Sequence, residues 1–419
     1  MTVNHKSEHS PQQQAKWKAN SQLRSSSLGD ELDETSDGNC FAAPGSSASA
    51  DDEPPGLTSP HLFSAGLVAD IQYSPIPDGF SFSGSPRYYQ YALEVAKHAF
   101  GHFNQDDDGH QHAIELVINL GDIIDGKCQD MGQFDGDPIV IAQAGDDPAM
   151  YALNHVLDAI SQYTKGPILH TYGNHCLYNM DRKQLQDKLG IEFVKELSGE
   201  KYDHELVGYN SHVHMGIRFV TLDSYDICMM QRCPDTSDKR KQAEALLRQH
   251  NPNYVKDDNM NSPEGLEDLE KRFVGFNGGV GEIQLKWLEE MLEEARQAKQ
   301  KVIVLSHQPI YPGSSGAVCL MWNYDQVLSV LRSYSDVVTL SLSGHAHKGG
   351  YQRDPESGIH FRVVEAVLEN KPEKTYAIVD VHENEVVLHG FGNCQSAVYD
   401  FQHLTGKWAP TESESITSA

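Results

Sequence analysis

The sequence predicts an α/β fold with largely parallel strand pairing in one sheet. Two observations carry this prediction. From His61 onward, short apolar runs that are typical of buried strands alternate with amphipathic stretches that are typical of helices. Short polar blocks follow directly after most of the apolar runs. Sites in such folds gather beyond the carboxyl ends of the strands, so these blocks are the candidates for functional residues.

The predicted strands are short and apolar. Those that end at a polar block cover 62–69, 114–120, 167–172, 302–305 and 337–342. Another strand is predicted at 217–222, and a C-terminal hairpin at 376–381 and 385–388. We interpret this C-terminal run as part of a second, mixed sheet that packs against the first.

The amphipathic stretches predict helices between these strands. Ser85 and Pro86 are typical of a helix start, with Ser as the N-cap and Pro at the first helical position. Further helices are predicted at 151–163 and 284–295. The charged, weakly periodic stretch 231–272 indicates an inserted helical excursion with loops.

Composition divides the chain into one domain and two tails. Residues 1–60 are rich in Ser, Gln, Asp and Glu and lack apolar periodicity, so we expect a disordered tail. Residues 61–405 form the predicted globular domain, and 406–419 form a C-terminal tail. A hydrophobic fraction of 39% is enough for a sizeable core.

Charge and cysteine content restrict the partners and the compartment. With 33 basic and 60 acidic side chains the net charge is −27, which repels nucleic acid and anionic membranes. Seven cysteines, an odd number at low density, are typical of free thiols in a reducing compartment. The sequence shows neither a transmembrane run nor the apolar core of a secretory signal. We therefore expect a cytosolic, monomeric protein that does not bind nucleic acid or membranes.

The polar blocks contain a complete set of ligands for two divalent cations. These residues are Asp70, Gln72, Asp122, Asn174, His307, His345 and His347. We assign Asp70, Gln72, Asp122 and His347 to one metal ion and Asp122, Asn174, His307 and His345 to the other. Two such ions, ~3.5–4 Å apart, activate a shared water as hydroxide that attacks phosphorus in line. His175 is placed to protonate the leaving oxygen or to stabilise the transition state.

Sequence spacing also predicts how these side chains point and which metal they prefer. Asp70 and Gln72 alternate at a strand end, so both side chains would face one side, and the same holds for His345 and His347. The amide oxygen of Gln72 is a harder ligand than imidazole, which favours Mn²⁺ or Mg²⁺ over Zn²⁺ or Fe. We expect manganese, with magnesium as the alternative.

The polar blocks resemble those of the calcineurin-like metallophosphoesterase superfamily, whose usual first block is Asp-x-His where this chain has Asp70-Ile71-Gln72. Further stretches make the resemblance more specific: Gly173-Asn174-His175, Phe276-Asn277-Gly278-Gly279, Ser306-His307-Gln308-Pro309-Ile310-Tyr311-Pro312 and Cys319-Leu320-Met321-Trp322-Asn323-Tyr324. With them, residues 67–392 resemble the branch of manganese-dependent ADP-ribose/CDP-alcohol diphosphatases. The acidic residue that follows Gly-Asn-His in that branch is replaced here by Cys176.

The resemblance implies a four-layer αββα sandwich of two mixed sheets flanked by helices. It implies cleavage of the diphosphate in nucleoside-diphosphate-linked substrates such as ADP-ribose, CDP-choline or CDP-glycerol. The products would be a nucleoside monophosphate and a phosphorylated partner. It also implies a nucleotide pocket formed near Phe276, Asn277, Cys319, Trp322 and Tyr324. By its position, Tyr73 would stack on a base or ribose.

Other interpretations of the same residues stay open. The chain could be a generic phosphomonoesterase or phosphodiesterase, or an inactive metal-binding scaffold, although the intact ligand set argues against the scaffold. Asp125 is interpreted as a turn cap rather than as a ligand. Residues 104–115 have the spacing of a calcium loop, but Glu115 falls in a predicted strand where a helix would be needed. His212 and His214, without an evident carboxylate partner, are interpreted as surface residues or as residues that support a ligand.

Overall fold

The computed structural model describes residues 59–81, 84–105, 112–191, 208–230, 238–257 and 259–404. The predicted tails lie outside these residues, apart from Ser59 and Pro60. The centre of the stretch that resembles a calcium loop, residues 106–111, also lies outside them. Glu115 is in a strand, as expected.

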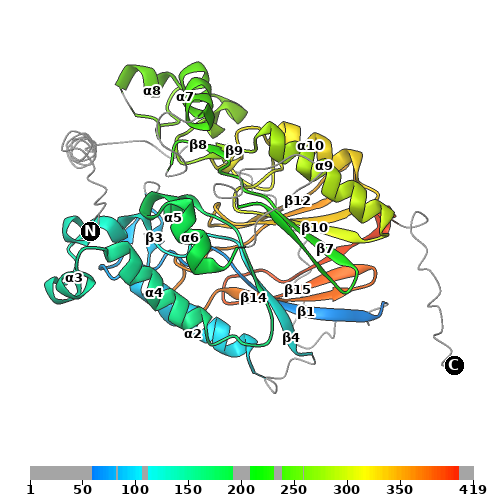
Figure 1. Ribbon diagram of the computed structural model, residues 1–419, viewed down its shortest axis with the longest axis horizontal. Helices are drawn as coiled ribbons and strands as arrows, with labels where there is room; N and C mark the ends of the chain where they lie inside the picture. The colour runs from blue at the N-terminus through cyan, green and yellow to red at the C-terminus, as the bar shows by residue number, and fades with distance from the viewer. Residues whose placement is uncertain are drawn as a thin grey trace, which may run out of the picture. The chain divides into compact units, whose positions relative to one another are not determined.

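Two six-stranded mixed sheets form the framework of the described domain (Figure 1). The first has the order β16-β15-β14-β1-β4-β5 and the second has the order β12-β13-β11-β10-β7-β6. In the first sheet these are β1 (His61–Val68), β4 (Ile114–Asn119), β5 (Ile168–His170), β14 (Tyr376–His382), β15 (Glu385–Phe391) and β16 (Ala397–Asp400). In the second they are β6 (Asn210–His214), β7 (Ile217–Thr221), β10 (Lys301–Ser306), β11 (Val338–Ser343), β12 (Gly350–Arg353) and β13 (His360–Val363).

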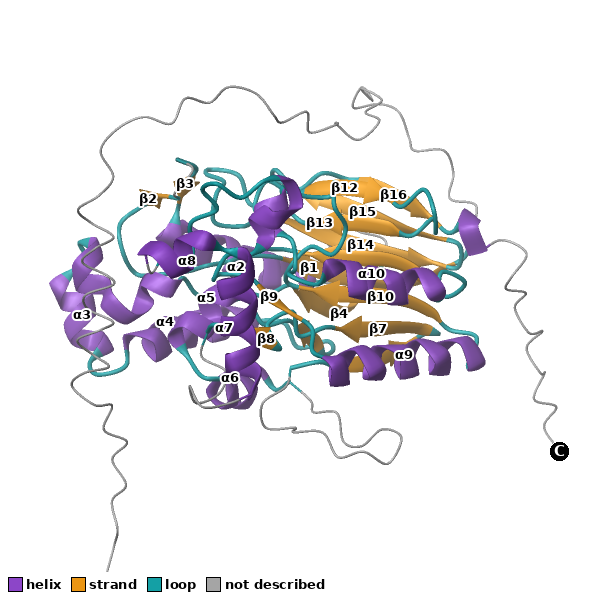
Figure 2. Cartoon of the chain, turned by 90° about the horizontal axis from the view of Figure 1, so that it is seen from above, coloured by secondary structure: helices purple, strands orange, loops and turns teal. Residues whose placement is uncertain are grey.

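Helices cover the outer face of each sheet, which gives four layers. Helices α2 (Tyr89–Phe103) and α4 (Pro148–Ile160) lie against the first sheet (Figure 1). Helices α9 (Glu282–Gln297) and α10 (Tyr324–Ser333) lie over the second sheet, as the view from above also shows (Figure 2). The predicted αββα sandwich is therefore confirmed.

The alternation of side chains along the strands produces three apolar layers. Leu67 and Ile118, which are paired in register between β1 and β4, point into the layer between the two sheets, together with Leu305 of β10. Their neighbours Val68 and Val117 point to the opposite face, where α2 and α4 pack. Because β1 and β4 are buried on both faces, their sequences are apolar almost throughout.

The other helices and strands lie outside the two sheets and the four helices that cover them. They are α3 (Pro138–Ala144), α5 (Asn174–Asn179), α6 (Arg182–Leu189), α7 (Asp238–His250), α8 (Pro252–Asp257), β2 (Gly79–Phe80), β3 (Pro86–Arg87), β8 (Ile227–Cys228) and β9 (Gly278–Gly279), with 3₁₀ helices at Gly126–Phe134, Asp268–Arg272, Ala317–Cys319 and Gln402–Leu404. The helical excursion predicted in the 231–272 region is confirmed for its described residues. No helix in the described part of the chain has the length and apolar character needed to cross a membrane.

Two predictions about elements are wrong. The C-terminal hairpin exists, but it belongs to the first sheet, because β14 pairs antiparallel with β1 along its length. The second sheet comes instead from the middle of the chain. Ser85-Pro86 does not start a helix, since Pro86 and Arg87 pair with Gly79 and Phe80, and α2 begins only at Tyr89.

Candidate metal centre

The polar blocks meet where the strands of both sheets end. Asp70 and Asp122 follow the parallel strands β1 and β4 of the first sheet, and His307 and His345 follow the parallel strands β10 and β11 of the second. The backbone N–H of His345 donates to Asp70 Oδ2 at 2.9 Å, which joins the two sheets at this point. Residues from four strands therefore converge on one place.

The candidate ligands have an unusual backbone conformation. Among the described residues, eight non-glycine residues have a positive φ, and four of these are the predicted ligands Asp70 (53°), Gln72 (45°), Asp122 (52°) and His345 (67°). Such conformations cost about 1–3 kcal/mol each and concentrate at functional sites. Left-handed turns, rather than the predicted strand alternation, aim Asp70 and Gln72 at each other. The block of His345 and His347 is also a turn and not an extended segment.

Two glycines allow the backbone to approach the carboxylates. A Cβ atom on Gly173 would lie 1.9 Å from Asp122 Oδ1, and one on Gly344 would lie 2.6 Å from Asp70 Oδ2. No side chain fits at such distances. These glycines are therefore part of the site, because they let the carboxylates occupy the junction of the sheets.

Residues assigned to the first metal ion are in direct contact. Gln72 Nε2 lies 3.1 Å from Asp122 Oδ2 and 3.0 Å from His347 Nε2. It also donates to Asp70 Oδ1 at 3.4 Å, while Gln72 Oε1 is buried without a hydrogen-bond partner among the described residues. Rotating the side-chain amide of Gln72 by 180° exchanges the positions of its nitrogen and oxygen. The amide oxygen would then face Asp70, Asp122 and His347 and could bind a cation.

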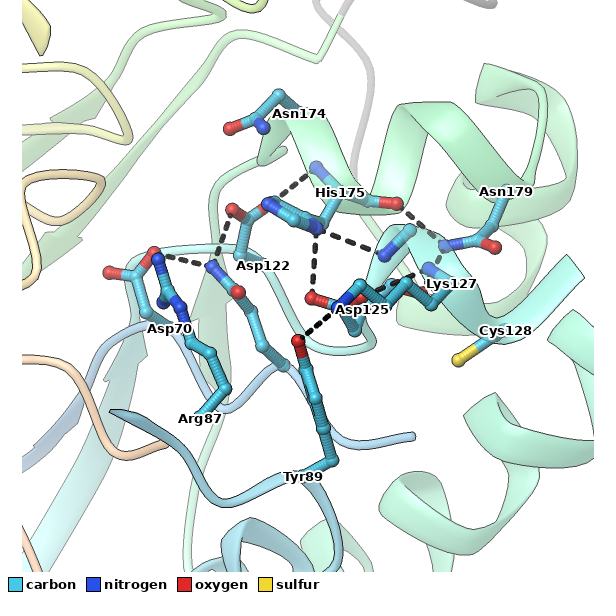
Figure 3. A network of polar contacts seen from close by, with 12 residues as sticks. Asp70, Arg87, Tyr89, Asp122, Asp125, Lys127, Cys128, Asn174, His175 and Asn179 are labelled. Carbon is cyan, nitrogen blue, oxygen red and sulfur yellow. Dashed lines mark hydrogen bonds and ion pairs between the residues drawn. The ribbon is translucent and has the colours of Figure 1, made fainter. Parts of the chain in front are cut away.

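Three of the four ligands assigned to the second metal ion also converge. Asp122, His307 and His345 are buried and each offers a ligand atom within 4.8 Å of the others. The fourth, Asn174, starts α5 and lies beside Asp122 (Figure 3). Asn174 Oδ1 accepts a hydrogen bond of 3.1 Å from the hydroxyl of Tyr225, which fixes the orientation of the amide.

Hydrogen bonds set which imidazole nitrogen is available. His307 Nδ1 lies 2.6 Å from the carbonyl oxygen of Leu120, so Nδ1 carries the proton and Nε2 faces Asp122 Oδ2 at 3.2 Å. His345 Nε2 lies 2.8 Å from Asn277 Oδ1, which leaves Nδ1 of His345 for the site. Both contacts orient a neutral imidazole as a metal ligand requires.

Buried charge dominates the electrostatics of the site. Burial lowers the pKa of His307, but the carboxylates of Asp122 and Asp70 outweigh this and raise it to about 9. Burial and the nearby His307 hold the pKa of His345 well below its ordinary value. Burial raises the pKa of Asp70, yet His347 and His307 bring it below the usual range. The carboxylates are thus ionised and attract positive charge.

The residues present fit a pair of divalent cations. Gln72 Oε1 is a fully buried polar atom without a hydrogen-bond partner among the described residues. Such atoms are rare in native proteins and call for an unseen partner, for which a cation is the simplest choice beside Asp70 and Asp122. Carboxylate, amide and imidazole together suit hard or borderline ions such as Mn²⁺ and Mg²⁺.

His175 stands at the edge of this cluster and pairs with Asp125. Its Nδ1 lies 3.1 Å from Asp125 Oδ2, and its side chain is 27% exposed, whereas Asp122 is buried (Figure 3). Its backbone N–H donates to Asp122 Oδ1 at 2.8 Å. Asp125 also accepts from the backbone N–H of Lys127 at 2.9 Å, which confirms the predicted turn cap and adds a contact to His175.

The predicted nucleotide-pocket residues differ in their exposure. Phe276, Cys319 and Tyr324 are partly exposed, and the Phe276 ring centroid lies 6.0 Å from that of His345. Tyr73, Asn277 and Trp322 are buried, and Asn277 contacts His345 as described above. Contacts of these six residues with a substrate stay predictions.

Several residues at the site had no recognisable signal in the sequence. Tyr225, Arg87 and Glu369 lie in no motif and follow no predicted strand that ends at a polar block. Only their positions after folding bring them to Asn174 and His347. The replaced acidic position, Cys176, is buried, and its Sγ accepts from the backbone N–H of Ile123 at 3.2 Å.

A family model described as calcineurin-like phosphoesterase matches residues 65–349. The chain belongs to this family. As a calcineurin-like phosphoesterase it is similar to the Arabidopsis thaliana protein named manganese-dependent ADP-ribose/CDP-alcohol diphosphatase, with 38% identity over 343 residues that make up 81% of this chain and 97% of that protein. A Homo sapiens protein of the same name is 33% identical, over 82% of this chain and 94% of its own length.

This calcineurin-like phosphoesterase is also similar in structure to a solved phosphatase. The crystal structure of a dimetal phosphatase from Danio rerio aligns with a TM-score of 0.68 and 30% identity. The alignment covers 81% of this chain and 99% of that one. The family resemblance predicted from the polar blocks is confirmed.

Proposed function

We propose that the protein is a dinuclear metal-dependent hydrolase that cleaves the diphosphate of nucleoside-diphosphate-linked substrates, such as ADP-ribose, CDP-choline and CDP-glycerol. The products are a nucleoside monophosphate and a phosphorylated partner. The observation that carries the proposal is that relatives of 33–38% identity, aligned over nearly their full length, bear the name manganese-dependent ADP-ribose/CDP-alcohol diphosphatase. The convergence of carboxylate, amide and imidazole groups supports it independently.

Each residue has a role in this proposal. Bound divalent cations would activate water and neutralise the phosphate oxygens. Asp70, Gln72, Asp122 and His347 would hold one cation, and Asp122, Asn174, His307 and His345 would hold the other. Asp122 is common to both sets: its Oδ2 lies 3.1 Å from Gln72 Nε2 and 3.2 Å from His307 Nε2, while its Oδ1 accepts from the backbone N–H of His175.

His175 is the proposed proton donor to the leaving phosphate oxygen. Its side chain is 27% exposed, against 10% for that of His347, which suits a group that meets substrate. Two contacts at Nδ1 hold the ring in place: the backbone N–H of Gly126 donates to it at 2.9 Å, and Asp125 Oδ2 lies 3.1 Å away. On the substrate side, Phe276, Cys319 and Tyr324 have the exposure needed to contact a nucleotide.

A small substrate panel tests the proposal. The full-length protein is assayed with Mn²⁺ on ADP-ribose, CDP-choline and an aryl phosphate, with Asp122→Asn as the variant that removes the shared ligand. We expect release of a nucleoside monophosphate from the diphosphates and a loss of at least about 100-fold in the variant. Turnover of the aryl phosphate alone would favour the phosphomonoesterase alternative, and no turnover of any substrate would favour the scaffold.

The preferred metal and the partners follow from the same reasoning. We propose Mn²⁺ as the preferred ion, with Mg²⁺ as the alternative, because the donors are carboxylate, amide and imidazole. A net charge of −27 supports a small-molecule substrate rather than nucleic acid. The cytosolic location and the monomeric state stay predictions from the sequence.

A further inference from the structure

Glu369 lies behind the candidate metal ligand His347. Its Oε1 is 2.9 Å from His347 Nδ1. The other ring nitrogen, Nε2, is 3.4 Å from Asp70 Oδ1 and 3.0 Å from the Gln72 amide. The imidazole therefore bridges the Glu369 carboxylate and the metal centre.

This contact decides which nitrogen of His347 carries the proton. Two side chains contact Nδ1 of His347: the Glu369 carboxylate, which only accepts hydrogen bonds, and the Arg87 guanidinium, which only donates them. Arg87 Nη1 also lies 3.1 Å from Glu369 Oε1 and is paired with it there, so the ring proton of the neutral imidazole is assigned to Nδ1, toward Glu369. The lone pair of Nε2 is then directed at Asp70 and Gln72, as metal ligation requires. His307 and His345 obtain the same restriction from Leu120 and Asn277, but only His347 obtains it from an anion.

Contacts with other elements hold Glu369 in place. The backbone before it is bound to the site, since Val367 N–H donates to the carbonyl of Ala69 at 3.1 Å. The carbonyl of Leu368 accepts from Tyr88 N–H at 2.8 Å, just before α2. Arg87 Nη1 lies 3.1 Å from Glu369 Oε1, and the Glu369 side chain is only 11% exposed. The carboxylate thus has little freedom to leave His347.

We propose that Glu369 is a positioning residue that fixes the tautomer and the orientation of His347 for one of the two metal ions. The inference rests on the proposed function, because it takes His347 as a ligand. Partners of this kind typically contribute 10–100-fold to metal affinity. The structure assigns this contribution to the metal site that contains His347, and not to the site that contains His345.

The test measures Mn²⁺ binding by calorimetry and the Mn²⁺ concentration for half-maximal activity on ADP-ribose. Glu369→Ala should weaken one of the two Mn²⁺ sites by about 10–100-fold. Activity should return at higher Mn²⁺, so that kcat at saturation stays close to that of the unaltered protein. Glu369→Gln keeps an acceptor oxygen without the charge and should have a smaller effect.

The matched control is Glu115→Gln. Glu115 Oε2 lies 2.8 Å from His214 Nε2, a carboxylate–imidazole pair outside the candidate metal site. Its loss should leave both Mn²⁺ affinities unchanged. A double-mutant cycle completes the design: Glu369→Ala should add nothing in the background of His347→Ala, since its effect passes through that ring.

The possible outcomes separate the two proposals. An unchanged Mn²⁺ isotherm in Glu369→Ala, equal weakening of both sites, or additive losses in the double variant would each overturn the role of Glu369 while the hydrolase proposal stands. A lack of Mn²⁺ binding in the unaltered protein would overturn the proposed function itself. Selective weakening of one site with rescue by Mn²⁺ would support the inference.

Discussion

At the residue scale, the metal centre depends on conformations that most side chains avoid. Asp70, Gln72 and Asp122 are held at positive φ. Gly173 lies against Asp122 with no room for a side chain. These features are costly unless the rest of the structure enforces them. They therefore identify positions where a small change should affect the site more than the fold.

Gly173→Ala tests the close approach. Its Cβ would lie 1.9 Å from Asp122 Oδ1, so the carboxylate has to move. We expect kcat/KM to fall by about 100-fold, because a displacement of 1 Å at reacting groups has effects of this size. The control is Gly316→Ala, where a Cβ meets nothing within 4 Å among the described residues. Similar activity in the two variants, measured on ADP-ribose, would contradict the prediction.

Gln72→His tests the argument from ligand hardness. Imidazole is a softer donor than an amide oxygen, so the variant should bind Zn²⁺ or Fe more strongly relative to Mn²⁺. The measurement is the metal content of protein equilibrated with equal concentrations of the ions. An unchanged ratio would count against the role of Gln72 in metal preference.

At the scale of elements, the loops after the strands control the protonation of the site. The loop after β10 places His307 next to the carboxylates of Asp122 and Asp70, which raise its pKa to about 9 in the metal-free protein. A proton and a metal ion compete for Nε2. Metal binding and folding stability therefore depend on pH in opposite ways.

The pH dependence of the metal-free protein has a definite sign. Because the folded state raises the pKa of His307, its protonation stabilises the fold below pH 6.5, and this contribution is lost as the pH rises toward about 9. Over the same range the Mn²⁺ affinity should increase, since fewer protons are displaced. The measurement is the Tm of the metal-free protein and of the metal-free His307→Gln variant as a function of pH. The decrease in Tm between pH 6.5 and about 9 that is due to His307 should be absent in the variant.

Helix α6 and the segment after β7 are joined by a buried ion pair. The guanidinium of Arg182 binds Asp223, and both side chains are fully buried. Asp223 Oδ1 in turn accepts from the backbone N–H of Tyr225 at 3.0 Å, and Tyr225 orients Asn174. The ion pair therefore links α6 and the segment after β7 to the candidate ligand Asn174, through Tyr225.

Arg182→Ala should be strongly destabilising. Removing one partner leaves the Asp223 carboxylate buried without its counter-ion, which costs about 3–5 kcal/mol. Urea unfolding of the metal-free protein measures the effect. Lys97→Ala, an exposed position on α2, is the matched control and should change the free energy of unfolding by less than about 0.5 kcal/mol.

At the scale of the whole molecule, the metal centre joins two sheets. Asp70 and Asp122 come from the first sheet, and His307 and His345 come from the second. Ions bound by both groups would stabilise the packing of the sheets against each other. Bound metal should therefore contribute to the stability of the whole domain, and not only to a loop.

Mn²⁺ should raise the stability of the domain by mass action. At a free concentration of 100 times Kd, one site contributes about 2.7 kcal/mol. Thermal melts with increasing Mn²⁺ measure this as a rising Tm. In Asp122→Asn the rise should be largely lost, because this residue belongs to both ligand sets. A full rise in that variant would mean that Mn²⁺ binds elsewhere.

Much of this protein is determined by local sequence. Apolar runs mark the inner strands, and spacing marks α9, because a strand or helix that is buried must show its own periodicity. The candidate ligands Asp70, Asp122 and His345 also have a local signal, since they directly follow strands, where functional sites gather in such folds.

Only the tertiary structure decided which strands share a sheet and which side chains meet. The C-terminal β14 pairs with β1, and Glu369 reaches His347 across a chain reversal, without any local pattern that marks either contact. Ser85-Pro86 predicts a helix start, yet Pro86 and Arg87 form β3, and Arg87 lies 3.1 Å from Glu369. The periodicity of a segment indicates which of its faces is buried. Which strand or side chain it contacts depends on residues far away in the sequence, and is fixed only when the whole chain packs.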